Sequence, residues 1–236
     1  MCAREEVLCS LEGLVRENQV PADLSMIFAH GTALHHIVQN ELLPKTGVLV
    51  GTWRCTFCGH TYGESNWEHR FVADAPHELV TRPEKCRCGE SQFVYVELML
   101  RDFIRRIQGH PDGFLRFDDM PGLGILEVKS ISPKGAWEVR GCPKMDHVIQ
   151  TQVYMHLTGC RWAKILYWDK GGSGVSALVE HTIDYDPDTV ERILTLVEEV
   201  REGIRMGKLP ERICAAIDCP RAGECPVAEA CFARDV

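Results

Sequence analysis

Acidic and basic side chains that could do chemistry together are concentrated between residues 109 and 130. Asp112 precedes one apolar run, and Glu127 and Lys129 stand at alternate positions inside the next one. Alternate side chains of a β-strand point to the same face, so Glu127 and Lys129 would share a face. A hairpin would bring Asp112 beside them. Two carboxylates and an ammonium are costly to bury in a core, but they are suited to holding a divalent cation against a phosphate.

Hydrophobic periodicity predicts the elements that would position these residues. Helices are predicted at residues 3–17, 25–43, 144–158 and 187–207, with Ser25 as an N-cap and Pro44 as a stop for the second helix. A three-strand meander is predicted at 93–101, 103–117 and 122–132, followed by strands at 163–169 and 175–183. This order of elements predicts an α/β domain built on a mixed sheet.

Length and composition are those of a globular chain of 236 residues, which predicts one sizeable domain, alone or with a small insert. No apolar stretch approaches the ~20 residues needed to span a bilayer. The first ten residues lack a basic segment followed by an apolar run, so we expect no secretory signal and a cytoplasmic protein. The net charge of −8 argues against nonspecific coating of nucleic acid, but it allows a local basic groove beside an acidic metal site.

Twelve cysteines in a reducing compartment indicate metal binding rather than disulfides. The first group reads CTFC-GH and CRC-GE, two tight turns that each have a glycine just past the last cysteine. Four thiolates in this pattern predict a tetrahedral, structural zinc site, and the insert 51–92 would need the metal to fold. The predicted zinc ligands are Cys55, Cys58, Cys86 and Cys88, and the residues expected to reach DNA from this insert are Trp53, Arg54, His60 and Arg87.

A second cysteine group lies near the end of the chain and lacks the glycines of the first group. Its members, in C-x4-C-x5-C-x5-C spacing, are Cys214, Cys219, Cys225 and Cys231. Four thiolates of this kind could hold either a second zinc ion or an iron–sulfur cluster.

Four separated patterns along the chain together resemble the PD-(D/E)XK nuclease superfamily, in its RecB-like exonuclease branch. The matching residues are Gly31, His35, Asp112, Glu127, Lys129, Gln150 and Tyr154. They occur in the family's order, each on the expected element, and the resemblance covers residues 25–170 apart from the insert. It implies a restriction-endonuclease-like fold, with a mixed central sheet flanked by helices.

The resemblance also implies a ligand set for Mg²⁺ or Mn²⁺: His35, Asp112, Glu127 and the backbone carbonyl of Val128. An imidazole ligand shifts the preference toward Mn²⁺, because Mg²⁺ favours oxygen. Taken singly, each residue has a structural explanation as well. Asp112 could serve only as a turn residue between proline and glycine.

The remaining residues of the resemblance would handle water and phosphate. Lys129 would orient the nucleophilic water or stabilise charge on the phosphorane. Gln150 and Tyr154, one helical turn apart, would share a face toward the site. Lys170 resembles a lysine that faces the substrate in some phage and mitochondrial members, although a lysine before Gly171 also suits a hairpin turn.

Iron–sulfur members of this branch, the CRISPR-associated and phage enzymes among them, place three cysteines near the C-terminus. Their fourth cysteine lies N-terminal to the histidine helix. The resemblance therefore implies a [4Fe–4S] cluster in preference to a second zinc ion. It leaves two ligand sets open here: all four tail cysteines, or Cys9 (or Cys2) in place of Cys214.

These inferences predict three parts: a nuclease core (1–50 and 93–210), a zinc-ribbon insert (51–92) and an iron–sulfur tail (211–236). The predicted function is a metal-dependent DNA exonuclease that hydrolyses phosphodiester bonds at single-stranded ends in recombination, repair or replication. The alternatives are a nuclease that processes CRISPR spacers and a non-catalytic DNA-binding module on a nuclease scaffold. The expected partner is DNA with free ends, with recombination or replication proteins and no membrane, in the cytoplasm of a bacterium or phage-infected host.

Overall fold

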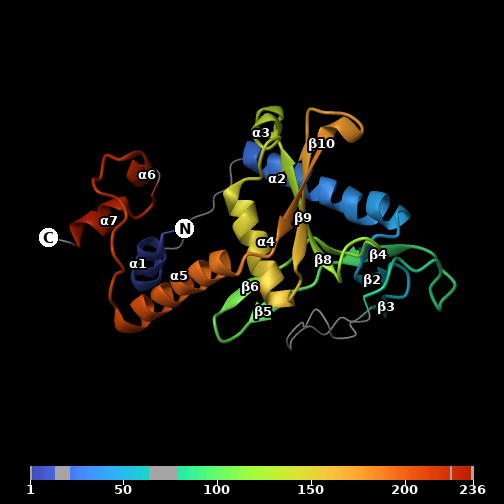
Figure 1. Ribbon diagram of the computed structural model, residues 1–236, viewed down its shortest axis with the longest axis horizontal. Coiled ribbons are helices and arrows are strands. Elements are labelled where there is room, and N and C mark those ends of the chain that lie inside the picture. Colours follow the sequence, from blue (N-terminus) through green and yellow to red (C-terminus); the bar gives the residue numbers. More distant parts are fainter. Residues whose placement is uncertain (1, 14–21, 64–78, 224, 235–236) are drawn as a thin grey trace. The chain divides into compact units, whose positions relative to one another are not determined.

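The computed structural model describes residues 2–13, 22–63, 79–223 and 225–234 (Figure 1). The chain divides into two compact units, one formed by residues 21–190 and one by residues 1–20 together with 191–236. Among the described residues, no helix is both long and apolar enough to cross a membrane.

A five-stranded mixed sheet forms the centre of the larger unit. Its strands, in spatial order, are β1 (Leu49–Val50), β7 (Gly113–Leu115), β8 (Gly124–Ile131), β9 (Trp162–Asp169) and β10 (Leu178–Asp184). Strands β8 and β9 run parallel, and every other neighbouring pair is antiparallel. The predicted α/β fold with a mixed central sheet is confirmed.

Helices and the insert cover the two faces of this sheet. On one face, Met155 of α4 (Met145–Thr158) packs with Phe114 and Ile125. The opposite face buries alternate residues, such as Leu126, against Val38 and the side chains of the insert. The other elements of this unit are α2 (Ala22–Ile37), the π-helical turn η1 (Val38–Leu42), the 3-10 turns η2 (Leu43–Lys45) and η3 (Val175–Ala177), and α3 (Pro133–Glu138).

The insert builds a small sheet of its own, in the order β3 (Thr61–Tyr62), β2 (Thr52–Cys55) and β4 (Phe93–Val96). Residues 64–78 of the predicted insert lie outside the described residues. Trp53 is fully buried and its ring meets Tyr95 edge-on, with 5.2 Å between centroids. The expectation that Trp53 contacts DNA is therefore wrong, whereas Arg54 and Arg87 are exposed and His60 is half-buried.

The predicted meander over residues 93–132 is divided among three sheets. The first predicted strand splits into β4, which joins the insert, and β5 (Leu100–Asp102), which pairs only with β6 (Ile107–Gly109). Pro111 follows β6 and cannot donate a ladder hydrogen bond, so strand pairing starts again at β7. The strand predicted at 175–183 begins as a 3-10 turn and becomes extended only at Leu178.

Two helix ends also differ from the prediction. Helix α2 begins at Ala22, three residues before Ser25, and it continues into the π-helical turn instead of ending as a regular helix. The helices predicted at 144–158 and 187–207 are confirmed as α4 and α5 (Pro187–Met206).

The smaller unit combines the two ends of the chain. Helix α1 (Ala3–Glu12) ends at Gly13, whose φ of 62° is the left-handed conformation that favours glycine. Residues 14–17 of the predicted helix lie outside the described residues. Leu8 of α1 packs against Val227 and against Cys231 of α7 (Ala228–Ala233), and the short helix α6 (Pro220–Gly223) precedes α7.

Candidate active site and cysteine clusters

Strand pairing brings Asp112 and β8 together, as the sequence predicted. Gly113 pairs with Leu126, so one further step of the antiparallel register places Asp112 opposite Glu127. The backbone N–H of Val128 donates to Asp112 Oδ2 at 2.6 Å. Asp112 is 6% exposed and Glu127 is 2% exposed, so two carboxyl groups are buried side by side.

Helix α2 adds His35 to this pair. His35 Nδ1 lies 3.1 Å from Asp112 Oδ1. This hydrogen bond raises the pKa of His35 above its usual value, against the opposing effect of burial. Gly31, one turn earlier, lets the helix approach β8, because a Cβ at Gly31 would lie 3.2 Å from Ser130 Oγ. Gly31 thus lets α2 lie close to β8, and His35 extends from the same helix to Asp112.

Glu127 is only half satisfied by its surroundings. Lys129 Nζ lies 2.5 Å from Glu127 Oε1. The other oxygen, Oε2, is buried and has no hydrogen-bond partner among the described residues. Burial, and next the negative charge of Asp112, raise the pKa of Glu127 to about 7. An unpaired, buried carboxylate oxygen is unfavourable by itself, and a bound cation would relieve it.

The α4 residues of the resemblance extend the network from Lys129. Lys129 Nζ donates to Gln150 Oε1 at 3.0 Å, and Gln150 Nε2 donates to the hydroxyl of Tyr154 at 2.9 Å. The ring of Tyr154 occupies the space that a side chain at residue 109 would fill, so Gly109 permits this packing. Burial raises the pKa of Tyr154, which therefore stays a neutral hydroxyl.

Three side chains of the larger unit could hold one metal ion. Ligand atoms of His35, Glu97 and Asp112 all lie within 4.8 Å of one another. The 3.1 Å between His35 Nδ1 and Asp112 Oδ1 suits an octahedral ion, for which bonds of ~2.1 Å place adjacent ligands about 3.0 Å apart. Glu97 was missed by sequence reasoning. The one indication of Glu97 in the sequence is that it directly follows the apolar run FVYV.

Two other predicted residues lie in or just after strands of the central sheet. The N–H of Val128 points toward Asp112, and the carbonyl of a strand residue projects to the same edge as its N–H, so the predicted carbonyl ligand faces the centre. Lys170 follows β9, and its backbone N–H donates to the carbonyl of Ile131 at 2.9 Å. Its contact with DNA stays a prediction.

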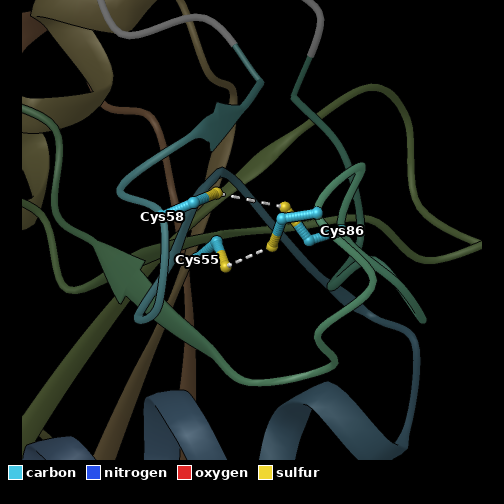
Figure 2. A group of neighbouring side chains, drawn as sticks. Cys55, Cys58 and Cys86 are labelled. Atoms are coloured by element: carbon cyan, nitrogen blue, oxygen red, sulfur yellow. Dashed lines mark hydrogen bonds between the residues drawn. The ribbon is translucent and has the colours of Figure 1, made fainter.

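The four cysteines of the insert form a compact group, with their ligand atoms within 4.8 Å of one another. Cys58 Sγ lies 3.6 Å from Cys86 Sγ, and Cys55 Sγ lies 3.7 Å from Cys88 Sγ. Figure 2 shows these side chains pointing toward one another. Tetrahedral zinc with Zn–S bonds of ~2.3 Å places sulfur atoms about 3.8 Å apart. The spacing therefore fits one tetrahedral metal ion.

Each pair of these cysteines is held by a tight turn that ends in glycine. Gly59 has a φ of 73° and Gly89 a φ of 97°, both in the left-handed region. The N–H of Gly59 donates to the carbonyl of Cys55 at 3.0 Å, and the N–H of Gly89 donates to that of Cys86 at 2.8 Å. The two turns are thus made by the glycines that the sequence pattern singled out.

The tail cysteines are arranged around a cavity of about 20 Å³ in the smaller unit. The cysteines that line it are Cys2, Cys214, Cys225 and Cys231. In the described part of the chain they do not form a group as compact as that of the insert.

Two further cysteines lie close to this cavity without lining it. Cys219 hydrogen-bonds to Cys214. Cys9 packs against the apolar cluster that contains Leu8 and Val227. Cys2 thus lines the cavity, while Cys9 packs against a cluster that also contains the tail cysteine Cys231. The guanidinium of Arg4 also donates to Cys231 Sγ at 3.2 Å.

Comparison with known proteins finds no matching family model and no matching curated protein. The alkaline exonuclease LHK-Exo of Laribacter hongkongensis is 23% identical, with a TM-score of 0.40 over 47% of this chain and 59% of that one. LHK-Exo in complex with dAMP is 20% identical, with a TM-score of 0.39 over 47% of this chain and 58% of that one. The crystal structure of SSO0001 is 13% identical, with a TM-score of 0.42 over 94% of this chain and 82% of that one.

The aligned regions span less than two thirds of the LHK-Exo chains. At these TM-scores the likeness carries no functional argument, so we argue the function from the geometry of the site.

Proposed function

We propose that this protein is a divalent-metal-dependent DNA nuclease whose reaction centre is formed by His35, Asp112, Glu127 and Lys129. The observation that carries the proposal is the buried Glu127 carboxylate, which has one oxygen on Lys129 and the other without a partner, beside Asp112 and His35. An ordinary core or surface gives no reason to bury two acids and leave one oxygen unpaired.

The chemistry that suits this centre is hydrolysis of a phosphodiester bond. A bound Mg²⁺ or Mn²⁺ would polarise a phosphoryl oxygen and balance the charge that develops there. Lys129 holds its ammonium between Glu127 Oε1 and Gln150 Oε1, where it can orient a water molecule or a phosphate oxygen. The nitrogen ligand His35 favours Mn²⁺ over Mg²⁺.

Within this activity, we favour an exonuclease that acts on single-stranded DNA ends in recombination, repair or replication, in the cytoplasm of a bacterium or of a phage-infected host. The exposed Arg54 and Arg87 of the insert, with Lys170, are its candidate contacts to DNA. The intact network from Glu127 to Tyr154 favours catalysis over a purely binding module. We keep the division into nuclease core, zinc-ribbon insert and tail as part of the proposal.

Degradation of end-labelled single- and double-stranded DNA tests this function. We expect cleavage with Mn²⁺ that EDTA abolishes. Asp112→Ala and Lys129→Ala should each lower the rate by at least ~10²-fold, while Glu84→Gln, at an exposed acid outside the centre, should cut normally. Undiminished degradation by Asp112→Ala would exclude this centre. DNA binding without cleavage by the wild-type protein in Mn²⁺ would establish the binding module instead.

We further propose a structural zinc ion on the four insert cysteines and a [4Fe–4S] cluster in the smaller unit. The cavity favours Cys2, Cys214, Cys225 and Cys231 as cluster ligands. Protein purified without oxygen should be brown, with absorbance near about 400 nm. Cys2→Ala should lose this absorbance and Cys9→Ala should keep it. The reverse result would assign the fourth ligand to Cys9, and a colourless protein with two zinc ions would replace the cluster by zinc.

A further inference from the structure

The hairpin formed by β5 and β6 carries a basic and apolar tip that takes no part in the reaction centre. Between its two strands the chain reads FIRR, at residues 103–106. Phe103 is 64% exposed and Ile104 is 74% exposed. Residues 100–109 contain three arginines and one aspartate, a net charge of +2 in a chain whose net charge is −8. Positive charge and bare apolar side chains are therefore gathered at one exposed turn.

Contacts among its own side chains order the tip. The backbone N–H of Arg105 donates to Asp102 Oδ1 at 2.9 Å, and the guanidinium of Arg105 donates to Asp102 Oδ2 at 2.9 Å. The guanidinium of Arg101 lies over the ring of Phe103, 6.0 Å from its centroid. Asp102 thus neutralises Arg105, while Arg101 and Arg106 are exposed. An ordered aromatic ring beside a cation is preorganised for a flat, negatively charged ligand.

Arg106 adopts a backbone conformation that does not suit an arginine. Its φ of 55° lies in the left-handed region, and it is the only residue other than glycine with a positive φ in the described part of the chain. Glycine is the usual residue at such a turn position, because a Cβ there crowds the following carbonyl oxygen. A strained residue in an exposed turn points to a function for its side chain, since folding alone would favour glycine.

The base of the hairpin is fixed beside the reaction centre. Leu100 is buried in the core cluster that includes Tyr154, and its strand partner Gly109 lies against the ring of Tyr154. Figure 1 shows the hairpin beside α4, the helix that carries Tyr154. Asp112 follows Ile104 by eight residues, which span at most about 29 Å when fully extended. The tip and the centre can therefore contact the same short strand of nucleic acid.

We propose that the β5–β6 hairpin is a stacking platform for single-stranded DNA. Phe103 takes the face of an unpaired base, with Ile104 as its apolar neighbour, and Arg101 and Arg106 bind phosphates of the same strand. Aromatic rings hold unpaired bases of any sequence, and arginines hold the backbone. The inference deepens the proposed nuclease function and rests on it for its catalytic meaning, because the strand held here leads to Asp112. Paired bases offer no free face within a duplex, so the platform selects unpaired DNA.

Fluorescence anisotropy with a labelled single-stranded oligonucleotide tests the platform on the full-length, zinc-loaded protein. Without added Mn²⁺ the DNA is bound and not cut. We expect Phe103→Ala to weaken binding by ~5–100-fold, the range for loss of one stacked aromatic ring, and Phe103→Trp to keep wild-type affinity. Binding of a blunt duplex of equal length should change much less. Met206→Ala, at an exposed apolar residue of α5, is the control.

Arg106→Gly separates the charge of the tip from its shape. Glycine suits the φ of 55°, so the thermal midpoint of unfolding should not fall. The affinity for single-stranded DNA should fall nevertheless, and its logarithmic dependence on salt should become shallower by about 0.7, the value for one phosphate contact. Arg101→Gln should change this dependence by the same amount. Arg205→Ala, at an exposed arginine of α5, should leave it unchanged.

Two results would overturn the proposal. One is wild-type affinity for single-stranded DNA in both Phe103→Ala and Arg106→Gly, with zinc content and the thermal midpoint showing that both variants are folded. The other is a Phe103→Ala protein that loses binding to phosphatidylserine vesicles but not to DNA, which would make the tip a lipid contact. A protein that binds DNA through the hairpin but does not cut it in Mn²⁺ would keep this inference and remove the proposed function. Hairpin variants that bind and cut DNA as the wild type does would do the reverse.

Discussion

The two candidate metal-binding regions of the larger unit are built in opposite ways. The four insert cysteines come from two short turns, and their sulfur atoms already stand 3.6 and 3.7 Å apart in pairs. The reaction centre instead gathers one or two residues from each of α2, β8 and the segments beside β4 and β7. It carries strain that the insert lacks, because Glu127 is buried with an unpaired oxygen. Local turns can preform a ligand set, whereas convergence of distant segments leaves a buried charge that a proton or a bound ion relieves.

Strand β4 also joins the two regions. We therefore expect the largest effect from a substitution that removes zinc from the insert. Cys86→Ser should abolish zinc binding and unfold the insert, because structural zinc supplies on the order of 10 kcal/mol in zinc-finger peptides. Since Glu97 follows β4 and its carboxylate lies in the group with His35 and Asp112, Mn²⁺ binding by that group should weaken as well. Zinc content, near-ultraviolet circular dichroism of the buried Trp53 and Mn²⁺ counting check this. Cys142→Ser, at an exposed cysteine outside both groups, is the control. Unchanged Mn²⁺ binding in Cys86→Ser would show the two regions to be independent.

The strain at Glu127 predicts the next largest effect. Its pKa is about 7 in the folded, metal-free protein and near 4.5 when unfolded, so the fold prefers the protonated carboxyl. The resulting loss of stability is absent below pH 4.5, grows as the pH rises to 7 and is complete above it. Glu127→Gln should therefore stabilise the metal-free protein by up to about 3 kcal/mol at pH 8 and by nothing at pH 4. Urea unfolding in EDTA measures this. Equal free energies of unfolding for Glu127→Gln and the wild type at pH 8 would show that the buried Glu127 carboxylate does not destabilise the metal-free protein.

A smaller effect concerns protons that compete with the cation. Asp112 raises the pKa of His35 above 6.5, and a protonated imidazole cannot ligate a metal. The Mn²⁺ affinity of the group formed by His35, Glu97 and Asp112 should fall about tenfold per pH unit as the pH drops below the pKa of His35. In Glu127→Gln, which lacks the Glu127 carboxyl whose pKa is also raised, this dependence on pH should persist. His35→Gln should weaken Mn²⁺ binding at pH 8, and its Mn²⁺ affinity should no longer depend on pH in this range. If the pH profile of His35→Gln equals that of the wild type, the prediction is wrong.

Features that depend on short spacings were predictable. The period of two along β8 places Glu127 and Lys129 together, and the helical period places Gln150 beside Tyr154. The glycines after the insert cysteines predicted both turns. Glu97 could not be found in this way, because its partner Gln39 is 58 residues away and acts through a π-helical turn that no periodicity announces.

The amino-acid sequence by itself determined the local pieces of this protein: the strand that carries Glu127, the helix that carries His35 and the two cysteine turns. Periodicity and glycine conformations act over a few residues, so they can be read directly. Tertiary structure alone decided that β4 leaves the predicted meander for the insert, that Trp53 is buried and that Glu97 and Cys2 reach their clusters. These outcomes depend on which surfaces from distant segments pack together. The free energy of that burial is set by pairs of segments, so it cannot be read from any single stretch of the chain.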